Sequence, residues 1–479
     1  MLTLHEQIDV HRPVHEAFSY IADFRTTTEW DSTAIAAEKL TPGPVAVGTV
    51  FLVTCKMPLG SIDIRYTLTG MDKDRKLVLQ GSSRFFDIED VIEFSPSVAG
   101  THIDYKATFT FKAGLGGIVK HFRKGLDEMG AESLSGMKAA LEDNFAAPQL
   151  TRKARRADHL VVPGLVRFTR LGYANSRKHW KPISAWQGDS HIVLTGASSG
   201  LGRAAAHRLA EMGARLTLVI RNADKADELR NSIVRETGNE NVAIELADLS
   251  LMSDVDALVQ RLLERGETID VLINNAGALF NERKLTSEGL EQSFALLLLS
   301  PYRLTQGLRP LLLKSEDARV VNVVSGGMYS QSLDVDKLQA PVENYSGSVA
   351  YARAKRALMV VTEQWAKEWA PDGITVNAMH PGWADTPGVE SSLPGFHKLT
   401  RKVLRSPDEG ADTIVWLAAA TEAAKVTGEL FLDREPRAKH MLSSTQESAA
   451  ERERLAAFLA EFPPAGKRRP GRSRKRAAG

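Results

Sequence analysis

The glycine-rich turn Thr195-Gly196-Ala197-Ser198-Ser199-Gly200-Leu201-Gly202 restricts the fold of this chain more than any other stretch. The apolar run 191–194 before it predicts a buried strand, and the alanine-rich run 203–210 after it predicts a helix. Between a strand and a helix, such a turn lets the backbone approach a pyrophosphate, which is then held at the helix N-terminus. A glycine-rich turn without a ligand is the alternative, so the interpretation depends on motifs further along the chain.

Residues 189–440 alternate apolar runs with helical patterns, which predicts an α/β domain with a doubly wound parallel sheet of the Rossmann type. At 479 residues the chain is too long for one core, so we expect a second domain. A net charge of +2 points to no particular class of partner. The predicted strands are His191–Thr195, Arg215–Ile220, Asn241–Leu246, Val271–Asn274, Arg319–Val324, Thr375–His380 and Glu429–Leu432.

Tyr351 and Lys355 lie four residues apart and therefore on one face of a predicted helix. A lysine ammonium beside a tyrosine, with a cationic nicotinamide ring nearby, stabilises the phenolate and lowers its pKa from about 10. Such a tyrosine transfers a proton while a hydride moves. Tyrosine and lysine also take this spacing by chance, but here they follow the glycine turn, Asn274-Asn275-Ala276-Gly277 and Ser325 in order.

In this order the motifs resemble those of the short-chain dehydrogenase/reductase family. The stretches 324–328, 379–389 and 394–397 are similar to the group called dehydrogenase/reductase SDR family member 12. The resemblance implies that Ser325 orients the substrate oxygen, that Tyr351 transfers the proton, and that Lys355 sets the tyrosine pKa and holds the ribose. It also implies these cofactor-binding residues: Thr195, Gly196, Ser198, Ser199, Gly200, Leu201, Gly202, Arg221, Asp248, Leu249, Asn275, Ala276, Gly277, Tyr351, Lys355, Pro381, Gly382, Trp383 and Thr386.

The end of the second predicted strand favours NADP over NAD. Ile220 stands where members of the family that bind NAD carry an aspartate for the ribose hydroxyls. Arg221 follows at once, and its guanidinium suits a 2′-phosphate, although a solvated loop arginine is the alternative. We expect Arg203 to add positive charge there.

One position departs from the family pattern. Leu297 stands where the family usually has an asparagine that holds a water in the proton relay. The departure leaves three alternatives: another route for the proton, slow turnover, or a domain that only binds the cofactor. Tyr329 is a candidate for the substrate pocket, and 390–403 for a lid with an apolar wall of Leu393, Pro394, Phe396 and Leu399.

Residues 1–145 predict an α+β helix-grip domain, in which a curved antiparallel sheet holds a long helix over about 117–145. The segment 12–24, with Glu29-Trp30-Asp31 and Val47-Gly48-Thr49, resembles the polyketide cyclase/START-like (SRPBCC) family. The resemblance implies a cavity for a hydrophobic ligand. A purely structural domain, or one with its own cyclase or hydratase activity, is the alternative, and His11, His15 and His102 are too scattered to form a catalytic set.

Residues 146–188 form a basic linker with interleaved apolar and aromatic residues. We favour a helix that packs on the C-terminal domain over contact with an anionic membrane surface. Residues 441–479 predict a charged helix over Ser443–Phe462 and then a basic, disordered tail that could also contact a membrane. No specific nucleic-acid site is predicted, and a homodimer is an expectation from the family.

The sequence predicts neither a signal peptide nor a membrane span, which favours the cytoplasm, with peripheral membrane association as a further option. The single cysteine, Cys55, excludes an internal disulfide framework, and no metal site is expected. The sequence thus predicts an NADP(H)-dependent oxidoreductase that interconverts a carbonyl and an alcohol on a small lipophilic substrate. The alternative is a non-catalytic, NADP-responsive lipid-binding protein.

Overall fold

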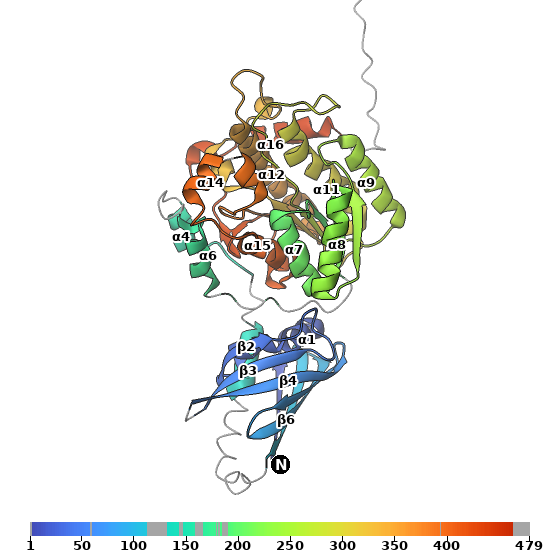
Figure 1. Ribbon diagram of the computed structural model, residues 1–479, viewed down its shortest axis with the longest axis vertical. Helices are drawn as coiled ribbons and strands as arrows, with labels where there is room; N and C mark the ends of the chain where they lie inside the picture. The colour runs from blue at the N-terminus through green and yellow to red at the C-terminus, as the bar shows by residue number, and fades with distance from the viewer. Residues whose placement is uncertain are drawn as a thin grey trace, which may run out of the picture.

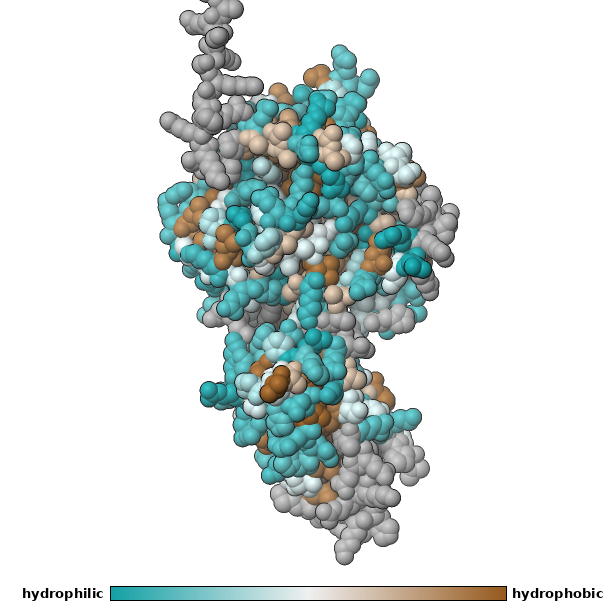
Figure 2. Space-filling view, turned by 180° about the vertical axis from the view of Figure 1, so that it is seen from behind, coloured by the Kyte–Doolittle hydropathy of each residue, from teal (hydrophilic) through white to brown (hydrophobic). Residues whose placement is uncertain are grey.

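The computed structural model describes residues 2–57, 60–112, 132–142, 147–158, 166–178, 180, 183, 190–392 and 394–462. In Figure 1 the N-terminal domain, coloured blue, lies at one end of the molecule and the larger C-terminal domain at the other. The face shown in Figure 2 is mainly hydrophilic, with small groups of hydrophobic residues scattered over it. Within the described ranges, no helix is both long enough and apolar enough to cross a membrane.

The N-terminal domain is a seven-stranded antiparallel sheet in the order β1-β7-β6-β5-β4-β3-β2. Side chains alternate between its two faces, so one face forms the core and the other meets solvent. Short helices precede the second strand: α1 (Val14–Ala22), η1 (Phe24–Thr26) and α2 (Thr27–Trp30). The strands are β1 (Leu2–Val10), β2 (Ala34–Lys39), β3 (Val50–Met57), β4 (Gly60–Asp72), β5 (Lys76–Ser82), β6 (Phe86–Ser97) and β7 (Gly100–Phe111).

The helix-grip fold predicted from the sequence is confirmed. Residues 132–142 are helical, and Met137 and Leu141 are buried in the core of this domain, whereas 117–131 and 143–145 of the predicted helix lie outside the described residues. Strand β2 is absent from the strands that the sequence predicts for this domain, which are Leu2–Val10, Thr49–Cys55, Ser61–Gly70, Lys76–Gly81, Phe85–Phe94 and Thr101–Phe111. This strand pairs only with β3 at the edge of the sheet, and its alanines and charges lack the apolar alternation that marks a half-buried strand.

The C-terminal domain is an eight-stranded sheet in the order β10-β9-β8-β11-β12-β13-β14-β15, parallel except at the last pair. The doubly wound fold is therefore confirmed, because one apolar cluster includes α7, α8 and α15 and the other includes α9, α11 and α12. The strands are β8 (His191–Thr195), β9 (Arg215–Ile220), β10 (Val242–Leu246), β11 (Val271–Asn274), β12 (Arg319–Val323), β13 (Thr375–Met379), β14 (Leu430–Leu432) and β15 (Glu435–Arg437).

The helices lie between and after these strands. The first half of the domain contains α7 (Gly200–Glu211), α8 (Ala223–Thr237), α9 (Met252–Arg265), α10 (Gln292–Phe294), the π-helix η2 (Ala295–Leu299) and α11 (Ser300–Leu312). The second half contains η3 (Gly326–Ser330), η4 (Val335–Lys337), α12 (Gly347–Trp369), η5 (Ala370–Asp372), α13 (Pro387–Ser392), α14 (Pro394–Thr400), α15 (Pro407–Ala419), η6 (Glu422–Lys425), η7 (Ser443–Thr445) and α16 (Ala449–Ala460).

The C-terminal helix begins later than the sequence analysis predicted. Ser448 and Glu451 form a capping box that fixes the first turn of α16, so the helix does not extend back to Ser443. Leu455 and Leu459 of α16 are buried in the core of the C-terminal domain.

The last two strands form a hairpin that the sequence analysis did not predict. Asp433 and Arg434 connect β14 to β15, and both have positive φ angles, 56° and 58°. This conformation is unfavourable for residues other than glycine. Long-range contacts stabilise the turn, because the Asp433 carboxylate pairs with Arg405 and the Arg434 guanidinium pairs with Asp412.

Part of the predicted linker packs on the C-terminal domain, in agreement with the favoured interpretation. Helix α4 (Arg152–Asp158) ends at a carboxylate that accepts a hydrogen bond from the Ala438 amide, 3.0 Å away. Phe168, just before helix α6 (Arg170–Arg177), is buried in the C-terminal core. The C-terminal domain therefore includes residues that the sequence analysis assigned to the linker.

Candidate functional site

A cavity of about 660 Å³ opens at the carboxyl ends of the parallel strands of the C-terminal domain. It lies where the strand order reverses, between β8 and β11, which is the usual ligand position in an open α/β sheet. The predicted residues that line it are Gly196, Ser198, Ser199, Gly200, Leu201, Gly202, Arg221, Asp248, Leu249, Asn275, Ala276, Gly277, Ser325, Tyr351, Lys355, Pro381, Gly382, Trp383 and Thr386.

The glycine turn cannot carry side chains at its critical positions. Gly196 has a φ of 70°, and a Cβ there would lie 2.7 Å from Cα of Ala276. A Cβ at Gly202 would lie 2.3 Å from the Gly196 carbonyl oxygen. Ser199 precedes α7 and makes no side-chain hydrogen bond to its first turn, so the backbone amides there can receive an anion.

Thr195 does not line the cavity, contrary to the prediction that it binds the cofactor. Its buried hydroxyl donates a hydrogen bond to the Ile273 carbonyl, 3.1 Å away, and accepts from the Asn275 and Ala276 amides at 3.0 Å. The Asn275 side chain returns a hydrogen bond to the Thr195 carbonyl at 2.9 Å. Thr195 thus joins the ends of β8 and β11 and positions the residues that form the cavity wall.

At the end of the cavity where we expect the adenosine of the cofactor, β9 ends in Ile220 and is followed by Arg221. Neither residue is acidic. The Arg221 side chain is 73% exposed, with Nη1 3.8 Å from Oδ2 of Asp248, so its charge remains available to a ligand. Arg203, predicted to add charge here, does not line the cavity, and its guanidinium lies 3.6 Å from Glu228. The positive charge at this end therefore comes from Arg221.

The predicted catalytic residues converge on the middle of the cavity. Ser325, after β12, and Tyr351, on α12, both line the cavity, and the Ser325 hydroxyl is near enough to the phenol to affect its pKa. The Lys355 ammonium lies 5.9 Å from the centre of the Tyr351 ring and donates a hydrogen bond to the Val323 carbonyl at 2.6 Å. Burial lowers the pKa of Lys355 to about 8.

The lowered pKa expected for Tyr351 depends on a cationic nicotinamide ring beside it as well as on Lys355. In the protein alone, burial raises the pKa of Tyr351, and the nearby Ser325 hydroxyl offsets this only in part. The physical reason is desolvation, which disfavours the phenolate. Tyr351 therefore retains its proton at neutral pH and is placed to donate it to a substrate oxygen.

Leu297 lies beside this group, as the alignment of motifs predicted. It is fully buried in η2. Gly277 lies between Leu297 and Lys355: a Cβ added at Gly277 would be 3.2 Å from Cδ2 of Leu297 and 3.8 Å from Nζ of Lys355. A π-helix shifts the register of the helix, so Leu296 faces the cavity while Leu297 packs behind it. The Leu297 side chain offers no hydrogen bond to Lys355 or to a water.

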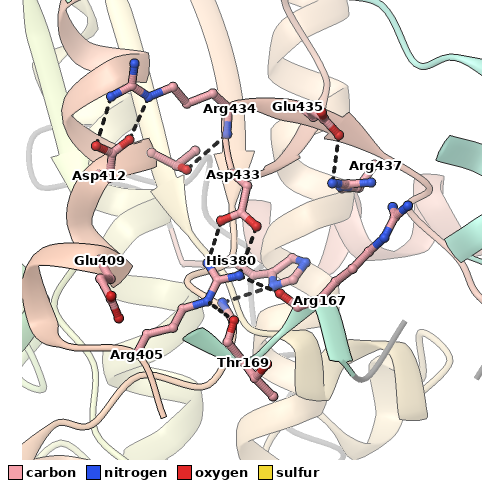
Figure 3. Close-up of polar contacts among 12 residues, drawn as sticks. Arg167, Thr169, His380, Arg405, Glu409, Asp412, Asp433, Arg434, Glu435 and Arg437 are labelled. Atoms are coloured by element: carbon pink, nitrogen blue, oxygen red, sulfur yellow. Dashed lines mark hydrogen bonds and ion pairs between the residues drawn. The ribbon is translucent and has the colours of Figure 1, made fainter. Parts of the chain in front are cut away.

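The loop after β13 contacts residues 167–169, and the Arg405 guanidinium lies between that segment and Asp433 (Figure 3). The Trp383 amide donates to the Phe168 carbonyl at 2.7 Å, and a Cβ at Gly382 would lie 2.6 Å from the same oxygen. A Cβ at Gly382 would also lie 2.8 Å from Nε of Arg405. The Arg405 guanidinium donates hydrogen bonds to the carbonyls of Arg167 and Thr169. Arg405 thus fills the space under the loop that lines the cavity.

Further cavity residues were not predicted. Leu279, Phe280 and Leu296 form an apolar wall, and Gln292 and Ser348 add polar groups. Leu279 and Phe280 follow directly after Asn274-Asn275-Ala276-Gly277, and that position is the signal that could have identified them.

Two predictions about the substrate end have different outcomes. Tyr329 does not line the cavity, because its ring is buried and its hydroxyl donates to the Ala438 carbonyl at 2.8 Å. The side chains of Leu393, Phe396 and Leu399, predicted as a lid wall, lie outside what the structure describes. Among the described residues, no group of acidic, histidine and cysteine side chains could hold a metal ion.

The C-terminal domain has a doubly wound fold, a glycine turn at the cleft and a group formed by Ser325, Tyr351 and Lys355. Together these features define an oxidoreductase with a cleft for a nicotinamide dinucleotide. Residues 190–395 match the short chain dehydrogenase family, and residues 1–142 match the family described as polyketide cyclase / dehydrase and lipid transport. The chain belongs to the short-chain dehydrogenase/reductase family and carries an N-terminal domain of the SRPBCC type.

Among its relatives is dehydrogenase/reductase SDR family member 12 of Bos taurus, which is 41% identical over 303 residues, or 62% of this chain and 95% of the relative. Human polyprenol dehydrogenase is 31% identical over 59% of this chain and 87% of its own length. A similar solved structure is L-sorbose reductase from Gluconobacter frateurii, complexed with NADPH and L-sorbose, at 25% identity and a TM-score of 0.44 over 52% of this chain and 95% of that one.

Proposed function

We propose that this protein is an NADP(H)-dependent oxidoreductase that interconverts a carbonyl and an alcohol on a lipophilic substrate. The observation that carries the proposal is the meeting of Ser325, Tyr351 and Lys355 in one cavity whose other end contains Arg221. A bound nicotinamide dinucleotide supplies or accepts the hydride. The glycine turn would hold its pyrophosphate and Arg221 its 2′-phosphate.

The protein's own groups handle the oxygen and the proton. The Ser325 hydroxyl would orient the substrate oxygen toward Tyr351, whose protonated phenol would donate in the direction of reduction. The Lys355 ammonium, fixed by the Val323 carbonyl, would add positive charge beside the phenol as the proton leaves.

The wall of the substrate end supports a lipophilic substrate. Leu279, Phe280, Leu296 and Trp383 present mainly apolar surface beside the catalytic hydroxyls. Two relatives have names that refer to lipophilic alcohols: polyprenol dehydrogenase and retinol dehydrogenase 13, the latter 30% identical over 75% of its length. The N-terminal domain would bind a hydrophobic ligand for the same chemistry.

Calorimetry with NADPH and NADH tests the cofactor assignment. We expect wild-type protein to prefer NADPH, and Arg221→Ala to weaken NADPH binding by roughly tenfold or more while NADH binding changes little. Arg203→Ala is the matched control, because Arg203 is a neighbouring arginine that does not line the cavity. Equal effects of the two substitutions would contradict the role of Arg221.

Turnover tests the chemical assignment. We expect wild-type protein to oxidise NADPH in the presence of some lipophilic ketones or aldehydes, and Tyr351→Phe to reduce kcat by about 10²-fold or more. Leu297 favours a second candidate, a protein that binds NADP without catalysis. Tight NADPH binding without turnover across a broad carbonyl series would support that candidate.

A further inference from the structure

A second cavity, the junction cavity, has a volume of about 130 Å³ and is lined by residues of both domains. The N-terminal domain contributes Arg25 of η1 and Lys39 at the end of β2. The C-terminal domain contributes Arg208 and Glu211 of α7, and Arg434 of the turn between β14 and β15. Four of these five side chains are cations, and packing of the two domains brings them together from four separate segments.

The two domains approach each other closely beside this cavity. Gly43, which lines it, has a φ of 84°, and a Cβ there would lie 3.0 Å from the Thr237 carbonyl oxygen at the end of α8. A single water needs roughly 10–15 Å³ of such space. The junction cavity therefore borders on closely packed backbone and still has room for a group larger than one water.

The three arginines of the cavity are only partly neutralised. Arg25 pairs through Nε and Nη2 with the buried Asp23, so that carboxylate does not engage Nη1. Arg208 and Arg434 share the carboxylate of Asp412, and Figure 3 shows its pair with Arg434. One carboxylate carries one negative charge, so Asp412 balances only one of these two guanidinium groups.

Lys39 and Glu211 complete the charges of the cavity. The Lys39 ammonium donates to the Thr41 carbonyl at 2.8 Å and to the Gly43 carbonyl, and it forms no ion pair within the described residues. Burial lowers the pKa of Lys39; Glu211 opposes this, and Arg25 adds to it. With the two carboxylates behind the arginines, four cations face three carboxylates, so positive charge is in excess.

We propose that the junction cavity binds a phosphate group, free or as a small phosphate monoester, that bridges the two domains. A phosphate accepts charge-assisted hydrogen bonds from guanidinium and ammonium groups on several sides, and the fork of an arginine suits it. The bound anion would offset the excess positive charge and strengthen the docking of one domain on the other.

This site is separate from the proposed cofactor cleft. Among the described residues the two share no lining residue. Helix α7 begins in the cleft at Gly200 and ends at the junction cavity with Glu211, which separates the two sites by about 18 Å of helix. The proposal therefore holds or fails independently of the reductase function. A gap that contains only water is the competing explanation.

The test is calorimetry with inorganic phosphate and with glycerol 3-phosphate, on the full chain without cofactor and at constant ionic strength in chloride. We expect phosphate to bind with a Kd of about 1 mM or lower. Binding of phosphate alone or of both probes fits the proposal and separates its two forms, whereas binding of neither overturns it.

Substitutions on the two sides of the cavity test the bridge. We expect Lys39→Gln and Arg208→Gln each to weaken phosphate binding by at least about fivefold, although they lie in different domains. Arg215→Gln is the matched control for Arg208→Gln. Arg215 is 36% exposed against 38% for Arg208, pairs with one carboxylate, Glu267, at 3.3 Å, and does not line the cavity.

Glu211→Gln should act in the opposite direction. It removes a negative charge from the cavity, so we expect phosphate to bind about two- to fivefold more tightly, a gain that a misfolded variant cannot produce. Glu267→Gln, outside the cavity, is its control. Equal effects of Arg208→Gln and Arg215→Gln, no gain in Glu211→Gln, or a loss seen only in Arg221→Ala, which would place the anion in the cofactor cleft, would each overturn the proposal.

Discussion

Arg405 and Asp433 form a buried ion pair, in which Nη1 lies 2.6 Å from Oδ1 and Nη2 lies 2.9 Å from Oδ2 (Figure 3). The same guanidinium donates to the Thr169 carbonyl and lies under Gly382. One side chain therefore connects the segment before the domain, the loop beside the catalytic group and the strained turn between β14 and β15.

Breaking this pair should destabilise the C-terminal domain. We expect Arg405→Met or Asp433→Asn to lower the free energy of unfolding by about 3–5 kcal/mol, because each leaves a buried partner uncompensated. Denaturant unfolding followed by tryptophan fluorescence measures this. Arg454→Ala, which breaks the exposed pair with Asp336, is the control and should change little. A loss below about 1 kcal/mol for Arg405→Met would show that the pair is not structurally important.

Gly202→Ala should weaken cofactor binding. The new Cβ would lie 2.3 Å from the Gly196 carbonyl oxygen, so the glycine turn must move and its amides lose their common direction. We expect calorimetry to show a loss of at least about tenfold in NADPH affinity. Gly395→Ala is the control, because nothing lies within 4 Å of a Cβ there. An unchanged affinity in Gly202→Ala would contradict the role of the turn.

Lys355 should give the stability a distinct pH dependence. Its pKa is about 8 in the folded protein, below the ordinary lysine value of 10.5 that applies to the unfolded chain. Between these values the unfolded chain binds more protons, so the free energy of unfolding should rise with pH, by at most about 1.4 kcal/mol per pH unit from this group. Below pH 8 the group contributes no slope. Unfolding measured from pH 7 to 10 should show this rise in wild-type protein, and Lys355→Met should lack it.

Leu297→Asn should destabilise the protein without increasing turnover. The position is fully buried, and an amide there would lose apolar contacts and lack a full set of hydrogen bonds, at about 2–4 kcal/mol. The Lys355 ammonium already donates to the Val323 carbonyl, so we expect no gain in kcat. Leu298→Asn, at the neighbouring buried position, controls for the stability effect. A higher kcat in Leu297→Asn alone would show that the relay is incomplete without the asparagine.

Local sequence patterns were enough to predict the C-terminal fold and most of its cleft. Buried parallel strands such as His191–Thr195 are short apolar runs bounded by turns, so local pattern reveals them. The glycine turn and the spacing of Tyr351 and Lys355 are also local, because each depends on neighbours within one or two turns of the chain. The strands of the N-terminal sheet were also predicted from local patterns, except β2, which pairs only with β3 at the edge of the sheet.

Features that depend on residues far apart in the sequence became visible once the strands and helices were packed. Arg405 contacts Thr169 across 236 residues, and Thr195 proved to support Asn275 across 80. The Tyr329 ring turned into the core, where its hydroxyl donates to the Ala438 carbonyl. Such contacts depend on how strands and helices pack, so they cannot be predicted from the residues that neighbour each position in the sequence.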